Sequence, residues 1–218
     1  MSVENKKTLE AYDKTASIYL ANSIEHDRLD IEKARKKQEK LWQFIEESFK
    51  NLPVGSDIIE IGSADGVNAK HLKELGYNTT ASDVAEAFLE ALKEQGLDPI
   101  KFNVLEDEFK KKYFGVLCWR VFVHFTREDA IKVLGKIYDA LENNGILIFN
   151  AINRETRTVD NEWVDFPGEY HMGIDRYYNY YTKEELDKII SHTKYKIEHF
   201  HKEGGDEKNK WLVYVLKK

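Results

Sequence analysis

Two acidic residues and two glycines lie at the ends of neighbouring expected strands. The run DIIEIGSADG at 57–66 places Glu60 near the end of an apolar strand, and Gly62 and Gly66 in the turn that follows. Gly62 lets the chain turn sharply, and Gly66 lacks a side chain where the next helix begins, so a ligand can approach the backbone amides. Asp83 ends the next expected strand, where a carboxylate can accept hydrogen bonds from both hydroxyls of a ribose. This spacing favours an adenosine-type ligand, although Asp83 by itself could equally cap a helix.

The turn differs from a dinucleotide-binding loop. The fingerprint G-x-G-x-x-G requires glycines at the positions that Ala64 and Val67 occupy. The carboxylate of Glu60 would also be a poor neighbour for a phosphate and a good one for a cation. The turn is therefore expected to hold a cationic ligand rather than a pyrophosphate.

Other residues that could do chemistry are Cys118, His124 and the segment 162–181. Cys118 lies in an apolar run, which is typical of a buried packing residue. His124 could act as a base or could be bonded to a neighbouring backbone group. The segment EWVDFPGEYHMGIDRYYNYY mixes carboxylates with aromatic side chains, which suits an amine or another polar, partly cationic small molecule. Alternatively, its aromatic rings pack onto the sheet and its acids are solvated, or pairing with Arg154, Arg157 or Arg176 cancels the preference for a cation. Glu169 and His171 near its middle are the candidate general bases.

Composition limits the class of protein. The 218 residues are 42% hydrophobic and 33% charged, which fits one globular domain with a substantial core. A net charge of −6 argues against broad attraction to nucleic acid, and the basic run KARKKQEK at 33–40 reads as a solvated helix face. One cysteine leaves no internal disulfide and no cysteine zinc site, so no metal is expected. The charged start MSVENKKTLE and the lack of a run of about 18 apolar residues predict a cytoplasmic protein without membrane contact.

The elements that position these residues alternate between strand and helix. Helical spacing at 29–49 is followed by expected strands at 57–61 and 77–83, helices at 67–75 and 84–95, and a short strand at 100–103. An apolar run at 115–123, a helix from Thr126 to about 141 and the strand ILIFNA after the turn NNG continue the pattern. After an irregular stretch of about 30 residues, Thr182 begins a helix with a capping box, and strands at 195–201 and 211–217 form an antiparallel hairpin. This order predicts an α/β fold, Rossmann-like and doubly wound, with helices on both faces of a mostly parallel seven-stranded sheet.

These stretches resemble the class I S-adenosylmethionine-dependent methyltransferases. E-I-G-S-A-D-G with Asp83 resembles their first motif, YFGVLCWRVFVHFTREDA their fourth strand and its "LLH" segment, and ALENNGILIFNA their "LKPGGILFIS". YDKTASIY resembles the helix that caps the cofactor in the small-molecule branch, and YYTKEELDKII the segment that introduces the last helix. The similarity covers nearly the whole chain and is closest to small-molecule enzymes, including the tellurite-resistance-like group.

The resemblance implies a cofactor site for S-adenosylmethionine, whose product is S-adenosylhomocysteine. Gly62 and Gly66, with Ser63 and Ala64 between them, would line the methionine part, and Glu60 would support its amino group. Asp83 would take the ribose, and the residues around the adenine and the sulfonium would be Val84, Asn103, Val104, Trp119 and Arg120, with Tyr12 and Tyr19 covering the cofactor. Three positions depart from the family pattern: Ala64 replaces the middle glycine, Phe114 replaces the aspartate that opens strand four, and Asn103 stands near the residue that reads the adenine amine.

The expected organisation is one structural domain, with a helical cap at 1–50, the cofactor-binding part at 51–218 and a substrate-side insertion at 152–181. The expected function is methyl transfer to an oxygen or nitrogen of a small molecule by a monomer or homodimer. Candidate catalytic residues are His124, Glu169 and His171, and candidate substrate residues are Arg120, His124, Trp163, Tyr170, His171 and Tyr178. Three alternatives remain: another transferase or a non-catalytic sensor on the same fold, methylation of a protein or RNA, and a non-enzymatic interaction module.

Overall fold

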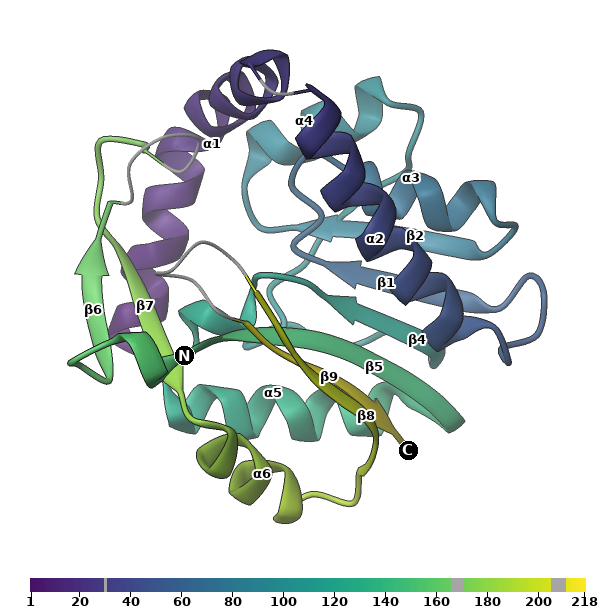
Figure 1. Cartoon of the computed structure of the whole chain (residues 1–218). Helices are drawn as coiled ribbons and strands as arrows, with labels where there is room; N and C mark the ends of the chain where they lie inside the picture. The colour runs from purple at the N-terminus through teal and green to yellow at the C-terminus, as the bar shows by residue number, and fades with distance from the viewer. Residues whose placement is uncertain (30, 166–170, 205–210) are drawn as a thin grey trace.

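The computed structural model describes residues 1–29, 31–165, 171–204 and 211–218, apart from the side chains of 23–29, 31–34 and 156. Five parallel strands form the centre of the sheet in the order β3-β2-β1-β4-β5 (Figure 1). Their bounds are β1 (Asp57–Ile61), β2 (Asn78–Asp83), β3 (Ile100–Lys101), β4 (Tyr113–Cys118) and β5 (Leu141–Asn153). The C-terminal hairpin of β8 (Lys196–Glu203) and β9 (Trp211–Lys217) continues the sheet, with β9 antiparallel to β5. These seven strands confirm the expected Rossmann-like class and the antiparallel ending.

Two more strands come from the segment that was expected to be irregular. This segment contains a 3-10 turn, η2 (Arg154–Thr156), and the antiparallel strands β6 (Asn161–Val164) and β7 (Arg176–Tyr181). The last two residues of β7 pair with Ile152 and Asn153 at the carboxyl end of β5. The described chain therefore holds a nine-stranded sheet, because the insertion adds β6 and β7 beyond the end of β4.

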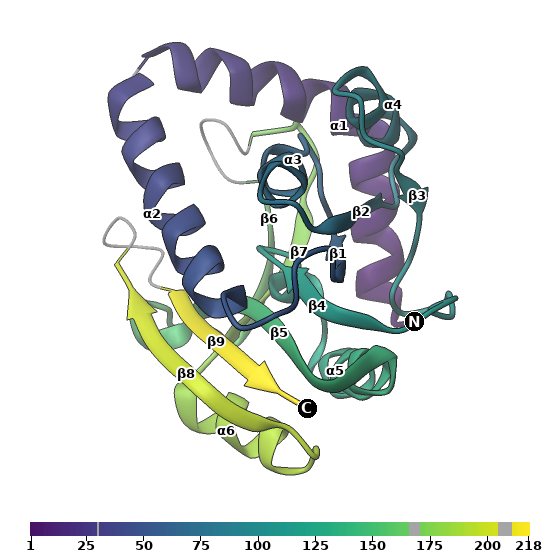
Figure 2. The same ribbon diagram turned by 90° about the vertical axis from the view of Figure 1, so that its right-hand side faces the viewer.

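Helices cover both faces of the sheet (Figures 1 and 2). Helix α2 (Ile31–Phe49) packs Ile45 and Phe49 on one face, against Ile58 of β1, and α3 (Val67–Glu74) adds Leu72 to the same cluster. On the other face, α5 (Arg127–Ala140) and α6 (Lys183–Ser191) bury Leu134 and Leu186. Strand side chains alternate between the faces. Glu60 therefore shares the α2 side with Ile58.

Helix α1 (Val3–Leu29) closes the carboxyl end of the sheet. Figure 1 shows β1 and β4 pointing toward α1 and β7, and α1 contacts β7, the 3-10 turn η1 (Phe122–His124) and α4 (Glu86–Glu94). Hydrogen bonds fix it there: the Tyr177 amide donates to Thr8 Oγ1 (3.0 Å), and Thr15 Oγ1 donates to the sulfur of Met172 (3.3 Å). Any ligand at the carboxyl edge therefore lies beneath α1.

Local signals in the sequence account for most element ends. Thr182 and Glu185 form the expected capping box, each side chain accepting from the other's backbone amide at 3.1 and 2.9 Å. The apolar run at 115–123 is not one strand, however. Strand β4 ends at Cys118 because Arg120 is left-handed (φ 60°), and Phe122–His124 form the 3-10 turn η1. The NNG turn lies inside β5 as an irregularity in its pairing with β4, with Asn144 at φ 63°.

None of the described helices combines the length and apolar character that a membrane span requires.

Candidate functional site

The loop after β1 is built from left-handed residues. Gly62, Ala64 and Gly66 have φ values of 73°, 45° and 78°, which glycine adopts freely and alanine does not. A Cβ at Gly66 would lie 2.5 Å from Leu92 Cδ2, and one at Gly62 would lie 2.5 Å from Val121 Cγ2. The missing side chain of Gly66 thus makes room for α4, and the approach of a ligand to the backbone amides of this loop stays a prediction.

Backbone and serine hydrogen bonds tie this loop to β2. The Ser63 amide donates to the Ser82 carbonyl (2.8 Å), and the Ser82 amide donates to Ser63 Oγ (3.1 Å). Ser63 is itself buried. The loop is thus held by internal bonds in the described structure and presents a fixed set of backbone groups.

Glu60 carries a buried carboxylate with one oxygen left over. The residue is 2% exposed, and its Oε1 accepts from Asn68 Nδ2 at 3.1 Å, while Oε2 has no hydrogen-bond partner in the described structure. Burial, which disfavours the charged form, raises the pKa of Glu60 to about 8. An oxygen of this kind is the group that a cationic ligand would satisfy.

Asp83 accepts three backbone amides. Its Oδ1 accepts from Val84 (2.7 Å) and Ala85 (3.2 Å), and its Oδ2 accepts from Ala64 (3.0 Å). Burial raises the pKa of this carboxyl group as well. Two carboxylate oxygens offer about four acceptor positions, so one remains for a ligand. The residue both organises the loop and can bind a hydroxyl.

Asn103 and Val104 follow β3 but use their side chains differently. Asn103 Oδ1 accepts from the Leu105 amide at 3.1 Å, and its Nδ2 has only distant partners in Glu106 (3.5 Å) and Met1 (3.6 Å). The Val104 side chain is buried in the main core. Of the two, only Asn103 presents a side-chain donor.

Trp119 and Arg120 follow β4 and make different contacts. Trp119 packs on the cluster that α2 forms with the sheet. The Arg120 amide donates to Asn150 Oδ1 at 2.6 Å, and its guanidinium lies 5.8 Å from the ring centre of Trp211. A left-handed arginine is uncommon and strained, and such residues concentrate at functional sites. Asn150 is buried, and its Nδ2 has no partner among the described residues.

His124 is held neutral beneath α1. Its Nδ1 lies 2.7 Å from the carbonyl oxygen of Tyr177, which can only accept, so Nδ1 carries the hydrogen. Burial lowers the pKa of His124 to about 4. The neutral ring therefore accepts, through Nε2, the hydroxyl hydrogen of Tyr12 at 2.9 Å. This is the alternative in which the histidine bonds a backbone group, and it makes His124 a support for Tyr12.

A fully buried arginine lies next to this pair. The side chain of Arg176 is 0% exposed; its Nη2 donates to Asp165 Oδ1 at 3.1 Å, and its guanidinium lies 5.5 and 5.7 Å from the rings of Tyr12 and Tyr178. Tyr178 is buried, with its ring 4.8 Å from that of His124. The cluster joins α1, η1 and β7.

The remaining candidates are spread along this side. Tyr19 packs edge-on against Phe88 of α4 (5.6 Å). Trp163 is half exposed on β6, next to Tyr177. The exposed ring of His171 bonds Asp165 through Nδ1 (3.0 Å). Glu169 and Tyr170 lie outside the described residues.

Three carboxylates of the 152–181 segment are paired with arginines. Besides the Asp165–Arg176 pair, Glu162 lies 3.3 Å from Arg157, and Asp160 lies 2.6 Å from Arg154. Pairing cancels most of the attraction that these acids would exert on a cation. The expected preference for a cationic acceptor therefore loses its basis in these residues.

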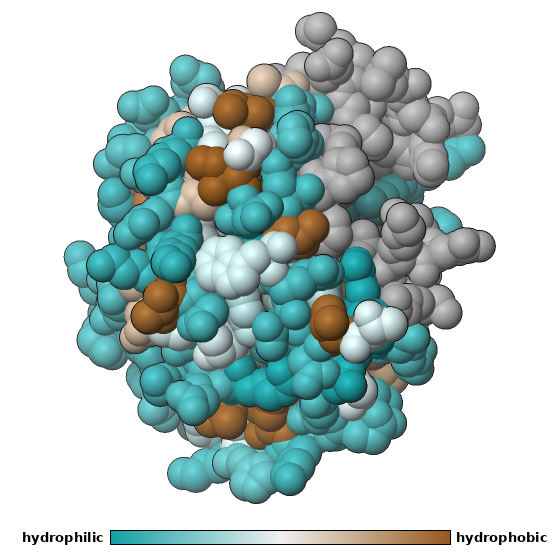
Figure 3. Space-filling view, turned by 90° about the vertical axis from the view of Figure 1, so that its left-hand side faces the viewer, coloured by the Kyte–Doolittle hydropathy of each residue, from teal (hydrophilic) through white to brown (hydrophobic). Residues whose placement is uncertain are grey.

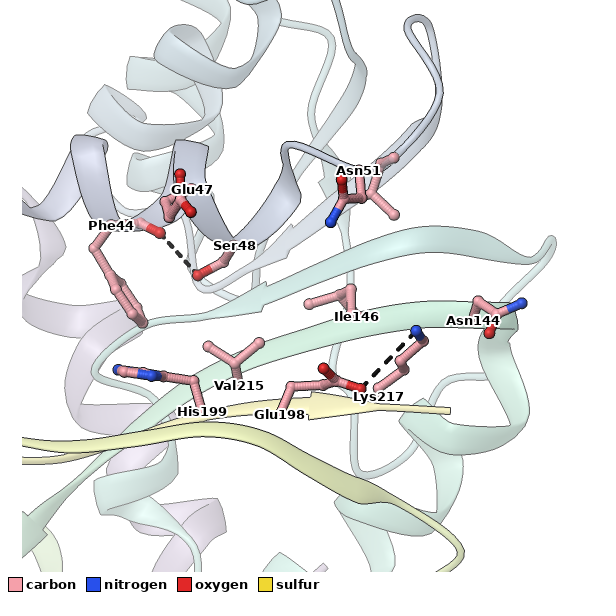
Figure 4. A pocket seen from close by; sticks show the side chains of 11 residues that line it. Phe44, Glu47, Ser48, Asn51, Asn144, Ile146, Glu198, His199, Val215 and Lys217 are labelled. Carbon is pink, nitrogen blue, oxygen red and sulfur yellow. Dashed lines mark hydrogen bonds and ion pairs between the residues drawn. The ribbon is translucent and has the colours of Figure 1, made fainter.

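A cavity of about 420 Å³ lies away from this edge (Figure 4). It opens between the end of α2 and the β8–β9 hairpin, and its lining includes Phe44, Glu47, His199 and Lys217. None of the residues expected to function lines it. The carboxyl edge, where the conserved geometry of the fold places ligands, is the better candidate.

The structure thus brings Glu60, the 62–66 loop and Asp83 together at two neighbouring strand ends, and Tyr12, His124 and Tyr178 together beneath α1. Sequence reasoning assigned no role to Asn68 or Asn150, and it considered Arg176 only as a possible partner for the acids of the 162–181 segment. A buried asparagine in a strand such as ILIFNA is a usable signal for Asn150. The partner of Arg176 could not be read from the sequence.

A model of the methyltransferase domain matches residues 33–199 of this chain. No curated protein matches it by sequence. Among solved structures, an S-adenosylmethionine-dependent methyltransferase from Clostridium acetobutylicum superposes with a TM-score of 0.68 at 15% identity, covering 92% of this chain and 98% of that one. Magnesium protoporphyrin IX methyltransferase from Synechocystis, with S-adenosylmethionine bound, gives 0.70 at 10% identity, covering 100% and 98%. A methyltransferase from Streptomyces caelestis gives 0.64 at 15% identity, covering 80% and 88%.

Proposed function

The chain belongs to the methyltransferase domain family, and on this premise we propose that it transfers the methyl group of S-adenosylmethionine to an oxygen or nitrogen of a small molecule. The observation that carries the proposal is the unpartnered Oε2 of Glu60, which lies beside the left-handed loop and one strand away from Asp83. A buried carboxylate oxygen fits the cofactor's ammonium group, and the acceptor position left on Asp83 fits a ribose hydroxyl.

The cofactor supplies a methyl group already activated on its sulfonium, so the chain has to bind, orient and exclude water. Glu60 holds the amino group, the amides of 62–66 face the methionine part, and Asp83 holds the ribose. Val84 and Asn103 border the adenine, Val104 does so through its backbone alone, and Tyr12 and Tyr19 cover the site from α1. Trp119 and Arg120 mark the strand end nearest the methyl group.

The acceptor binds between this site and the Tyr12–His124 pair. In this proposal the neutral His124 orients the Tyr12 hydroxyl, and Tyr178, Arg120 and the free amide hydrogens of Asn150 line the acceptor side. These groups donate hydrogen bonds, which suits an acceptor that carries oxygen. Helix α1 of the helical cap and the insertion at 152–181 form the wall opposite the sheet.

The size of the acceptor follows from α1. Because α1 is bonded across the carboxyl edge to residues of β7 and η1, an acceptor has to fit beneath a helix. On the face that Figure 3 shows, the visible hydrophobic residues are scattered among hydrophilic ones, whereas protein-docking patches are contiguous. The place beneath α1 favours a small molecule over a protein or RNA, and the scattered hydrophobic residues on this face give no support to a protein partner.

The test uses S-adenosylmethionine labelled in the methyl group, the purified protein and a cell extract divided into small and large molecules. Label that appears in the small-molecule fraction, and depends on Glu60, supports the proposal. Label only in macromolecules moves the acceptor to protein or RNA. Tight cofactor binding without any transfer indicates a protein that uses the site for sensing or another transfer.

A further inference from the structure

The carboxylate of Glu60 is oriented by a polar contact that reaches it from an N-terminal helix. Asn68, on the first turn of α3, donates from Nδ2 to Glu60 Oε1 at 3.1 Å. Its other amide atom, Oδ1, lies 2.8 Å from Gln38 Nε2 and 3.3 Å from Trp42 Nε1. Both of these residues belong to α2. One asparagine therefore connects α2 to the buried acid at the end of β1.

The indole decides which way the Asn68 amide points. Trp42 Nε1 is a donor and never an acceptor, so the atom that faces it has to be the amide oxygen of Asn68. The amide NH₂ then has to face Glu60. The amide orientation in this network follows from the chemistry of its partners.

Trp42 itself is held firmly. Its ring stacks on that of His71 with 4.1 Å between the ring centres and 6° between the planes. His71 Nε2 in turn lies 2.8 Å from Glu46 Oε1, which is again on α2. Helix α2 and helix α3 are thus joined by two side-by-side contacts, and the one through Asn68 ends on Glu60.

We infer that Asn68, oriented by Gln38 and Trp42 of α2, is a positioning residue that holds Glu60 with its free oxygen toward the cofactor's ammonium group. Helix α2 then contributes to cofactor affinity, in addition to belonging to the helical cap at 1–50. The inference rests on the proposed function, because it takes Glu60 to be the ammonium ligand.

The hydrogen bond from Asn68 to Glu60 can be measured through the pKa of Glu60, which depends on the groups around it. Asp65 on the loop raises the pKa of Glu60, as does burial, whereas the hydrogen bonds from Asn68 and Ser63 lower it. On the β4 side is the thiol of Cys118, whose own pKa burial and Glu60 raise. Across α2, Gln38 and Trp42 carry no titratable group. His71, which stacks on Trp42, and Asp83 on the neighbouring strand are other titratable groups of this region. Removing the Asn68 donor should raise the pKa of Glu60.

The test measures the dissociation constant of S-adenosylhomocysteine between pH 6 and 7.5 by calorimetry, for the full-length protein and its variants. Asn68→Ala should weaken binding by roughly tenfold to a hundredfold at pH 7, and binding should need a higher pH than in the wild type. Asn68→Asp has the same shape and puts a second acid beside Glu60, so it should raise the required pH further. The Gln38→Ala, Trp42→Phe double variant keeps a ring on His71 and should lose part of the affinity.

Arg35→Ala is the matched control, because Arg35 lies on α2 and its exposed side chain pairs with the exposed Glu39 (3.5 Å). It should bind like the wild type, and melting curves verify that each variant is folded. Folded Asn68 variants with the wild-type affinity and pH dependence would overturn the inference. If the wild type does not bind, or if Glu60→Gln binds equally well, the proposed function fails instead.

Discussion

The two sides of the carboxyl edge are built in different ways. On the β1–β2 side, the groups come from residues 60–66 and 83–85, which are close in sequence and bonded to one another. On the α1–β7 side, Tyr12, His124 and Arg176 come from segments more than 50 residues apart and meet only in the folded chain. The first side is a local motif, whereas the second is a long-range assembly. A local motif can be recognised from the sequence, whereas the contacts of a long-range assembly are known only from the structure.

The largest expected effect is on the stability of the assembled side. Arg176→Met removes the buried cation from the Asp165 pair, and breaking such a pair costs about 3 kcal/mol or more. Urea unfolding of the free protein measures this loss. Arg154→Met is the matched control, because its pair with Asp160 is partly exposed and such pairs contribute less than about 1 kcal/mol. Equal losses in the two variants would contradict the buried role of Arg176.

An effect of comparable size on the unfolding free energy is expected at Glu60, where the substitution should stabilise the protein relative to the wild type as the pH rises. Its folded pKa of about 8 lies above the ordinary value of 4.5, so the folded state holds the proton more tightly than the unfolded state. The stability this provides is complete below pH 4.5 and is lost as the pH rises through 8. By pH 7 the loss is about 3 kcal/mol, at about 1.4 kcal/mol for each pH unit.

Glu60→Gln lacks this titration. Between pH 4.5 and 7, the unfolding free energy of the wild type should therefore fall by about 3 kcal/mol relative to that of Glu60→Gln. Chemical denaturation of both proteins at the two pH values measures this difference. The same variant should bind the cofactor roughly tenfold to a hundredfold more weakly. A parallel pH dependence in the two proteins would show that Glu60 titrates normally.

A smaller effect is expected at Asp83, which belongs to the local side. Asp83→Ala removes an acceptor from three backbone amides and from the ribose, and should weaken cofactor binding by roughly 1 to 3 kcal/mol. Calorimetry with S-adenosylhomocysteine measures it. A dissociation constant equal to that of the wild type would return Asp83 to a purely structural role.

The smallest effect on binding is expected at Tyr12, on the assembled side. Tyr12→Phe keeps the ring beside Arg176 and removes the hydroxyl that donates to His124 Nε2. A hydrogen bond of this kind contributes about 1 kcal/mol. Cofactor affinity should stay within a few-fold, whereas the rate of methyl transfer should fall. If cofactor affinity fell as strongly as in Asp83→Ala, the two sides would not be separable.

The contrast also explains what the sequence could predict. Alternating periodicity and glycine-closed helices gave the parallel core, the hairpin and the capping box at Thr182, because each depends on neighbouring residues. The pairing of β7 with β5 and the burial of Arg176 depend on contacts across the chain, and periodicity carries no such information. The end of β4 was placed too late because an apolar run does not reveal that Arg120 is left-handed.

The candidate site follows the same division. The spacing of Glu60, the glycines and Asp83 predicted which residues gather at the strand ends, but not that Leu92 of α4 packs beside Gly66. The acid-rich segment suggested a cationic acceptor, with pairing to nearby arginines as the open alternative, and only the folded chain shows which acid each arginine pairs with. Asn68 drew no attention because its importance lies in the two helices and the strand that it joins.

The central claim is that Glu60 keeps a buried oxygen for the cofactor's ammonium group, and proton-linked calorimetry tests it most directly. S-adenosylhomocysteine is titrated into the wild-type protein at pH 6.5, in buffers of different ionisation enthalpy, well below the ordinary pKa of an amino group near 8. Because Glu60 has a pKa of about 8 in the free protein and has to be ionised when it pairs, binding should be one-to-one and release close to one proton. No binding by folded protein, or binding without proton release, would contradict the account.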